Sequence, residues 1–174
     1  KENINSVTFN HNSDQATLPY DDHFFGLIYG ISIITHLSVE KHQEWIQEMY
    51  RLLKPGGILI LTSHGDNFKS KLSREELLIY NSGQLVIRGN TKLGHRTFAA
   101  YHPTKAMQQL FAKFEILKHE QFDQEGLSYI PQDLWILRKY FLSFKSHKIC
   151  LISFENSIHF KPFAHLFLYI CQIH

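Results

Sequence analysis

The sequence has few cysteines, no cluster of basic residues and no long apolar stretch, and each shortage excludes a class of protein. Two cysteines in 174 residues, Cys150 and Cys171, cannot form a disulfide framework and fit a reducing compartment. The net charge is +2, and without a basic run there is no surface suited to nucleic acid. No stretch reaches the roughly 18 apolar residues of a membrane-spanning helix, and the first residues contain no apolar signal region. We therefore expect a cytoplasmic protein that binds neither nucleic acid nor membrane.

The residues that are present favour one packed domain. Hydrophobic residues make up 44% of the chain and charged residues 20%, which is enough apolar material for a core. The length fits a single domain of ordinary size.

Three consecutive segments predict a βαβ unit. Residues 24–29 and 58–62 are continuous apolar runs, which are typical of strands covered on both faces. Between them, residues 39–54 predict a helix that Ser38 caps and that Pro55-Gly56-Gly57 ends. Apolar residues recur along this helix at helical spacing and should face the sheet: Trp45, Ile46, Met49, Leu52 and Leu53.

The rest of the domain is predicted to complete an α/β layer. Helices are expected over residues 73–80 and 103–112, with a loop of some strand character over 81–96. Further strands are expected near residues 5–9, 114–119 and 134–138, in one layer with the first two.

The composition changes after Lys139. Residues 140–174 hold six of the fourteen phenylalanines but only one acidic residue, Glu155, and no glycine. The segment follows neither a period of two nor one of 3.6. A helical appendage, a partner-binding tail and sequence foreign to the fold all remain open, the first and the last being favoured. We therefore divide the chain into a domain at 1–139 and a tail at 140–174.

Several motifs in order resemble one enzyme family. They are Leu18-Pro19-Tyr20-Asp21-Asp22, the strand Phe24–Tyr29 with Gly30, Thr35-His36-Leu37-Ser38, and Leu53-Lys54-Pro55-Gly56-Gly57 with its following strand. Together with Tyr101-His102-Pro103 and the strand 134–139, they resemble the class I S-adenosylmethionine-dependent methyltransferases. The resemblance covers roughly residues 4–139. It implies a Rossmann-like sheet flanked by helices and S-adenosylmethionine as the cofactor.

Two departures from the family pattern limit this resemblance. The family's first strand ends in a glycine-rich turn and its second in an acidic residue that holds the ribose, but the 174 residues contain no Gly-x-Gly. The chain opens at what resembles the third strand, so we expect a sheet that is incomplete at its amino-terminal side. Gly26 also stands where the family usually has an acidic residue.

The resemblance implies half of a cofactor pocket and two candidate bases. Asn12, Ser13 and Asp14 would lie beside the adenine, and Gly30 and Ile31 would let the cofactor approach the backbone. His36, after one strand, could accept a proton from the methyl acceptor, with His64, after the next strand, as a second candidate. No His-x-x-x-His or Cys-x-x-Cys spacing occurs, so no metal site is expected.

The sequence thus favours methyl transfer to a small-molecule or glycan-type acceptor, although the chain by itself is expected to be inactive. The alternative is a non-catalytic, methyltransferase-like fragment or partner subunit. A nicotinamide oxidoreductase is a distant third reading, because its glycine-rich fingerprint is also absent. We further expect self-association through open sheet edges.

Overall fold

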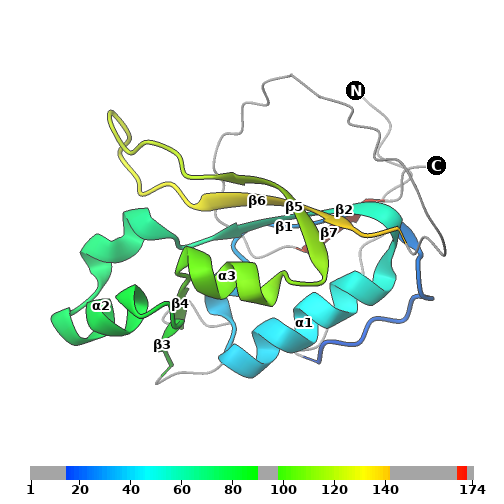
Figure 1. Ribbon diagram of the computed structural model, residues 1–174, viewed down its shortest axis with the longest axis horizontal. Helices are drawn as coiled ribbons and strands as arrows, with labels where there is room; N and C mark the ends of the chain where they lie inside the picture. Colours follow the sequence, from blue (N-terminus) through cyan, green and yellow to red (C-terminus); the bar gives the residue numbers. More distant parts are fainter. Residues whose placement is uncertain (1–14, 90–97, 142–167, 172–174) are drawn as a thin grey trace, which may run out of the picture.

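A five-stranded sheet forms the centre of the molecule, with the strand order β5-β6-β2-β1-β7 (Figure 1). The computed structural model describes residues 15–89, 98–141 and 168–171. β1 and β2 are parallel, and the remaining neighbours are antiparallel. The strands are β1 (Phe25–Gly30), β2 (Leu53–Ser63), β5 (Phe114–Glu120), β6 (Asp133–Lys139) and β7 (Leu168–Cys171).

These strands confirm the predicted α/β layer. The segments expected near 25–29, 58–62, 114–119 and 134–138 all lie in this one sheet. The strand expected at residues 5–9 lies outside the described residues.

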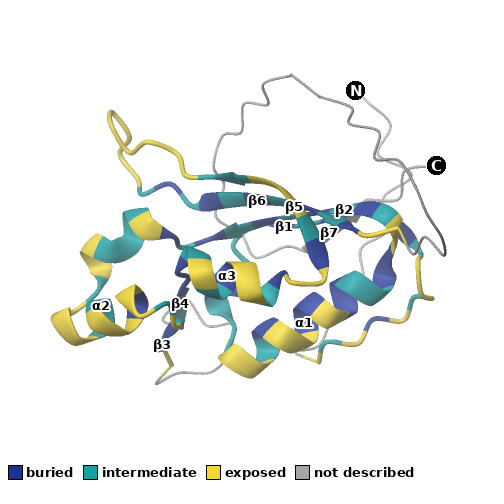
Figure 2. Cartoon of the chain, viewed as in Figure 1, coloured by how far each residue is buried: buried dark blue, intermediate teal, exposed yellow. Residues whose placement is uncertain are grey.

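Two helices cover one face of the sheet, α1 (Val39–Leu52) and α3 (Thr104–Leu110) (Figure 1). The predicted apolar stripe is confirmed as core, because all five of its residues are buried, four on α1 and Leu53 at the start of the next strand. Ser38 caps the helix as expected, its hydroxyl accepting the backbone N–H of Lys41. The face of α1 turned toward the sheet is therefore buried while its outer face is exposed (Figure 2).

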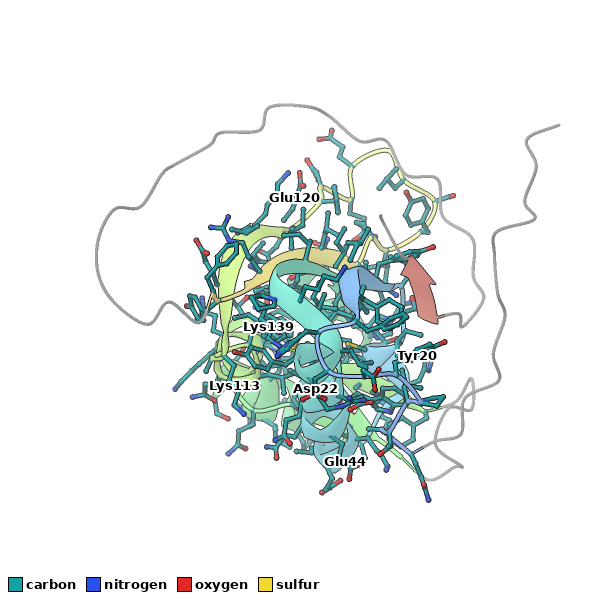
Figure 3. All side chains as sticks on the ribbon, turned by 90° about the vertical axis from the view of Figure 1, so that its right-hand side faces the viewer. Tyr20, Asp22, Glu44, Lys113, Glu120 and Lys139 are labelled. Carbon is teal, nitrogen blue, oxygen red and sulfur yellow. The ribbon has the colours of Figure 1, made fainter. Side chains whose placement is uncertain are left out.

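The junction between α1 and β2 differs from the prediction. The helix ends at Leu52 rather than Lys54, and β2 begins at once at Leu53 instead of at residue 58. Leu53 pairs with Phe25 of β1, and the Lys139 ammonium donates to the carbonyls of Tyr50 (2.6 Å) and Leu53 (2.9 Å). Lys139 thus satisfies the helix end from within the protein interior, whereas Glu44 and Glu120 lie at the periphery (Figure 3).

A smaller unit lies beside the carboxyl ends of β1 and β2. It consists of α2 (Arg74–Asn81) and a hairpin of β3 (Val86–Arg88) and β4 (Ala99–Tyr101). Ser73 and Glu76 form a capping box on α2, which starts one residue after the predicted position. Most of α2 is exposed (Figure 2). No helix within the described ranges is long and apolar enough to cross a bilayer.

Within the predicted tail, the structure describes one strand, β7 (Leu168–Cys171), whereas residues 142–167 and 172–174 lie outside the described residues. Leu168–Cys171 pairs antiparallel with Leu27–Gly30 of β1. β1 therefore has a backbone partner on each side, and β5 and β7 are the edge strands of the described sheet.

Candidate functional site

The carboxyl ends of β1 and β2 meet other strand ends at one edge of the sheet. Because β1 and β2 are parallel, Gly30 and Ser63 both lie there. β6 runs the opposite way and starts at this edge with Asp133, which pairs with Ser63. Open α/β sheets bind ligands at this edge, so we take it as the candidate site.

A closed ring of hydrogen bonds fixes the loop that follows β1. The Ser32 N–H donates to Thr62 Oγ1 (2.8 Å), and the Thr62 hydroxyl donates to Gln132 Oε1. Gln132 Nε2 in turn donates to Ser32 Oγ (2.6 Å). Ser32 has a φ of 57°, a left-handed conformation that these bonds help to hold. No local sequence pattern predicts this ring, because it joins residues up to 100 positions apart.

The two predicted bases both face the β4 segment. Nδ1 of His36 donates to the carbonyl of Phe98 (2.8 Å), and Nδ1 of His64 donates to that of Ala100 (3.1 Å). Each neutral ring therefore leaves its Nε2 as the acceptor. Burial lowers the pKa of His64 to about 4, and this ring also stacks on Phe68. His36 and His64 are both half-buried.

A second polar group at this edge was not predicted. The Asp133 carboxylate is buried, and its Oδ2 accepts from His119 Nε2 (2.7 Å) and Gln121 Nε2 (3.2 Å). Its Oδ1 has no partner among the described residues. Burial raises the pKa of Asp133 against the lowering effect of these donors. The His119 ring stacks on Trp135 with 3.6 Å between centroids, so the group also anchors the edge strand β5.

The predicted cofactor residues are placed only in part. Gly30 ends β1 at the candidate edge, and Ile31 beside it exposes its side chain, as a contact to a ligand requires. Asn12, Ser13 and Asp14 lie outside the described residues. Of the predicted cofactor residues, Gly30 and Ile31 therefore lie at this edge within the described residues.

Two surface grooves lie away from this edge. One, of about 580 Å³, is lined by charged residues of α1 such as Lys41 and Glu48. The other, of about 620 Å³, lies between α1 and α3 and includes Ile46 and Leu110. Neither groove is lined by Gly30, Ile31 or His36. Across the described ranges, no three His, Cys, Asp or Glu side chains come together as a metal site.

Comparison with known proteins gives a family match in the amino-terminal part. Residues 1–61 match the family model described as "Methyltransferase domain". No curated protein matches the sequence significantly.

Solved structures share the fold at low sequence identity. A SAM-dependent methyltransferase from Methanosarcina mazei superposes with a TM-score of 0.54 and 21% identity, covering 73% of this chain. The 1,6-didemethyltoxoflavin-N1-methyltransferase of Burkholderia thailandensis, solved with 1,6-didemethyltoxoflavin and S-adenosylhomocysteine, gives a TM-score of 0.52 at 10% identity over 72% of this chain. The chain spans 65% and 48% of the lengths of these two proteins. The chain therefore has the class I methyltransferase fold, and its first 61 residues match the methyltransferase domain family in sequence.

Proposed function

We propose that this domain serves the transfer of a methyl group from S-adenosylmethionine to a small-molecule or glycan-type acceptor. The observation that carries the proposal is the position of His36 at the carboxyl edge, with Nδ1 held by the Phe98 carbonyl and Nε2 left as an acceptor. The family match over residues 1–61 supports the reaction class. One structural neighbour is named for the methylation of a small molecule, which agrees with the proposed acceptor class.

The cofactor would lie against the end of β1. Gly30 and Ile31 would form its described wall, and Asn12, Ser13 and Asp14 would contact the adenine side. S-adenosylmethionine supplies the methyl group on a sulfonium that is already a good leaving group. The protein's task is then mainly to place the acceptor in line with that group.

His36 is proposed to take the acceptor's proton. An acceptor hydroxyl must lose its proton during transfer, and a neutral imidazole nitrogen is suited to receive it. The Phe98 carbonyl keeps the His36 ring in the required tautomer and orientation. His64 is the weaker candidate because its burial disfavours the imidazolium form.

The alternative is a methyltransferase-like chain without catalytic activity. Two sequence features favour it: the lack of Gly-x-Gly in the 174 residues, and Gly26 in place of an acidic residue. In that case the carboxyl edge would serve only to support a partner subunit.

A turnover assay at high cofactor concentration separates the two functions. The folded chain is incubated with millimolar S-adenosylmethionine and with sets of small-molecule and glycan acceptors, and S-adenosylhomocysteine is measured by mass spectrometry. We expect slow product formation that depends on the acceptor and is lost in His36→Asn. Asn keeps a donor for the Phe98 carbonyl but has no basic nitrogen, so the loop geometry is retained. Product formation no greater than in the absence of protein, with every acceptor, would favour the non-catalytic alternative.

A further inference from the structure

Three imidazoles hold alternate positions of one strand segment, residues 98–102. His36, in the 3-10 turn Ile34–His36, holds the carbonyl of Phe98, and His64, after β2, holds that of Ala100. The third is His42 of α1, whose Nε2 atom lies 2.9 Å from Nε2 of the His102 side chain. We call His36, His42, His64 and His102 the histidine clasp.

The geometry fixes where the protons of the central pair lie. Nδ1 of His42 is 2.6 Å from the Ser38 carbonyl, which can only accept, so this nitrogen carries a proton. In the neutral ring Nε2 of His42 is then an acceptor. The proton between the two rings must therefore belong to Nε2 of His102. This leaves Nδ1 of His102 as a bare nitrogen, and it has no hydrogen-bond partner within the described ranges.

The pair is buried where a second proton would be costly. His42 is 0% exposed and His102 is 1% exposed. If His42 gained a proton on Nε2, two N–H donors would face each other across 2.9 Å. The surroundings offer little compensation: Glu40 on α1 favours a charge on His42, whereas His42 and His64 both oppose a charge on His102. His36 opposes a charge on His64 in the same way.

The remaining groups around the clasp are neutral or already engaged. The Ile34 carbonyl faces both rings of the pair and favours their charged forms only weakly against burial. The Tyr80 hydroxyl of α2 lies within bonding distance of the His102 carbonyl (3.1 Å) and of the Asp66 carboxylate (2.9 Å). Burial consequently lowers the pKa of His42, His64 and His102, so these three rings are neutral at pH 7.

The segment held by the clasp belongs to a unit with its own internal bonds. β4 pairs with β3, and Arg88 of β3 reaches the Tyr101 hydroxyl (3.1 Å). Arg88 also donates to Glu76 of α2 through Nε (2.7 Å). These contacts contain no histidine, so they survive a change in histidine charge.

We propose that the buried His42–His102 pair makes the histidine clasp a pH-sensitive latch, which docks the α2–β3–β4 unit on the carboxyl edge and releases it when this pair is protonated. The bonds from His36 and His64 come from Nδ1 and persist in the charged rings, so the central pair is the pH-sensitive part. Release would uncover His36 and His64 and so change access to the edge where β1 and β2 end. The latch is independent of whether the domain transfers methyl groups.

Hydrogen–deuterium exchange of the full chain tests the latch between pH 7.5 and 5.0, with rates corrected for the intrinsic effect of pH. A free histidine has a pKa near 6.5, so the released state takes up protons below about that pH. We expect protection of residues 98–102 to fall about ten-fold per pH unit for each proton taken up, while β6 stays protected. Unchanged protection of 98–102, or equal loss in both segments, would overturn the proposal.

Two variants and one direct measurement sharpen the test. His102→Gln keeps an N–H donor toward His42 but cannot titrate, so protection should persist to lower pH. His119→Gln, which removes a half-buried imidazole outside the clasp, should respond like the original chain; an equal shift in both variants would contradict the latch. If His102→Gln does not fold, nitrogen-15 spectra of the original chain at pH 7.5 decide. They should show Nδ1–H on His42 and Nε2–H on His102, and the opposite tautomers would exclude the mechanism.

Discussion

At the scale of the residue, Lys139 is unusual because lysine side chains are rarely buried. It is 2% exposed, and its ammonium donates to two carbonyls where α1 turns into β2. The same group lies 4.4 Å from the centroid of the Tyr50 ring, a favourable cation–π distance. Burial lowers the pKa of Lys139, because an interior charge is costly. The contacts of the ammonium with the two carbonyls and with the Tyr50 ring offset part of this cost.

Replacing Lys139 should therefore weaken the fold. In Lys139→Met the side chain keeps most of its apolar length, but the Tyr50 carbonyl loses its ammonium donor and the Leu53 carbonyl keeps only His23 Nδ1, at 3.1 Å. We expect a loss of about 1–3 kcal/mol in the free energy of unfolding, measured with urea. Lys118→Met removes an exposed lysine of β5 and should change stability by less than about 0.5 kcal/mol. Equal effects of the two substitutions would show that Lys139 does not stabilise the helix end.

Gly65 and Gly26 differ in the space that their surroundings leave for a side chain. A Cβ at Gly65 would overlap the Asp133 carboxylate, whereas one at Gly26 would meet nothing within 4 Å. Gly65→Ala should thus destabilise by about 1–3 kcal/mol, because the buried carboxylate must shift. Gly26→Ala should be neutral or stabilise by up to about 1 kcal/mol, since alanine restricts the unfolded chain more. Thermal unfolding of both variants checks this, and a harmless Gly65→Ala would show that Asp133 is free to move.

At the scale of the element, the seam between α1 and β2 should be the most sensitive part of the core. Leu53 is 0% exposed and belongs at once to the end of the helix and to the first pair of the strand. Leu53→Ala is expected to cost about 2–5 kcal/mol in chemical denaturation. Leu78→Ala on α2, where the side chain is 69% exposed, should be close to neutral. A loss near zero at Leu53 would mean that the stripe is not part of the core.

The elements also show how far local sequence patterns reach. The buried strands, the α1 stripe and its Ser38 cap were predictable, because each follows from neighbours within one segment. The early start of β2 was not, because it depends on Phe25 and on Lys139, which lies 86 residues away from Leu53. The same limit applies at the candidate site. Gly30 follows directly from its strand, but the His42–His102 pair joins residues 60 positions apart.

At the scale of the whole molecule, the chain by itself should bind S-adenosylmethionine weakly. The proposed site has Gly30 and Ile31 as its wall among the described residues, and the 174 residues contain no Gly-x-Gly. Bonds to charged groups of a ligand are worth about 1.5–3 kcal/mol each, and a tenfold change in affinity about 1.4 kcal/mol. The loss of several bonds therefore weakens binding by orders of magnitude.

Isothermal titration of the purified chain measures this directly. We expect no saturation at micromolar cofactor, with S-adenosylhomocysteine binding no more tightly. Circular dichroism recorded on the same sample establishes that the protein is folded. A dissociation constant in the low micromolar range would contradict the expectation and would mean that another segment, such as the tail, completes the pocket.

The sheet order has a consequence for the speed of folding. β1–α1–β2 is one continuous stretch of chain, and β5 and β6 form a hairpin. The contacts within each of these two parts therefore join residues that are close in the sequence. The pairing of β2 with β6 joins residues about 70 or more positions apart, and such contacts are slow to form.

We expect Ile28→Val, within the β1–α1–β2 part, to slow refolding in stopped-flow experiments. Trp135→Phe, which removes the bond from β6 to Ser63 of β2, should mainly accelerate unfolding. The closure of β6 onto β2 would then be a late event in folding, and it brings Asp133 beside Ser63 and completes the carboxyl edge.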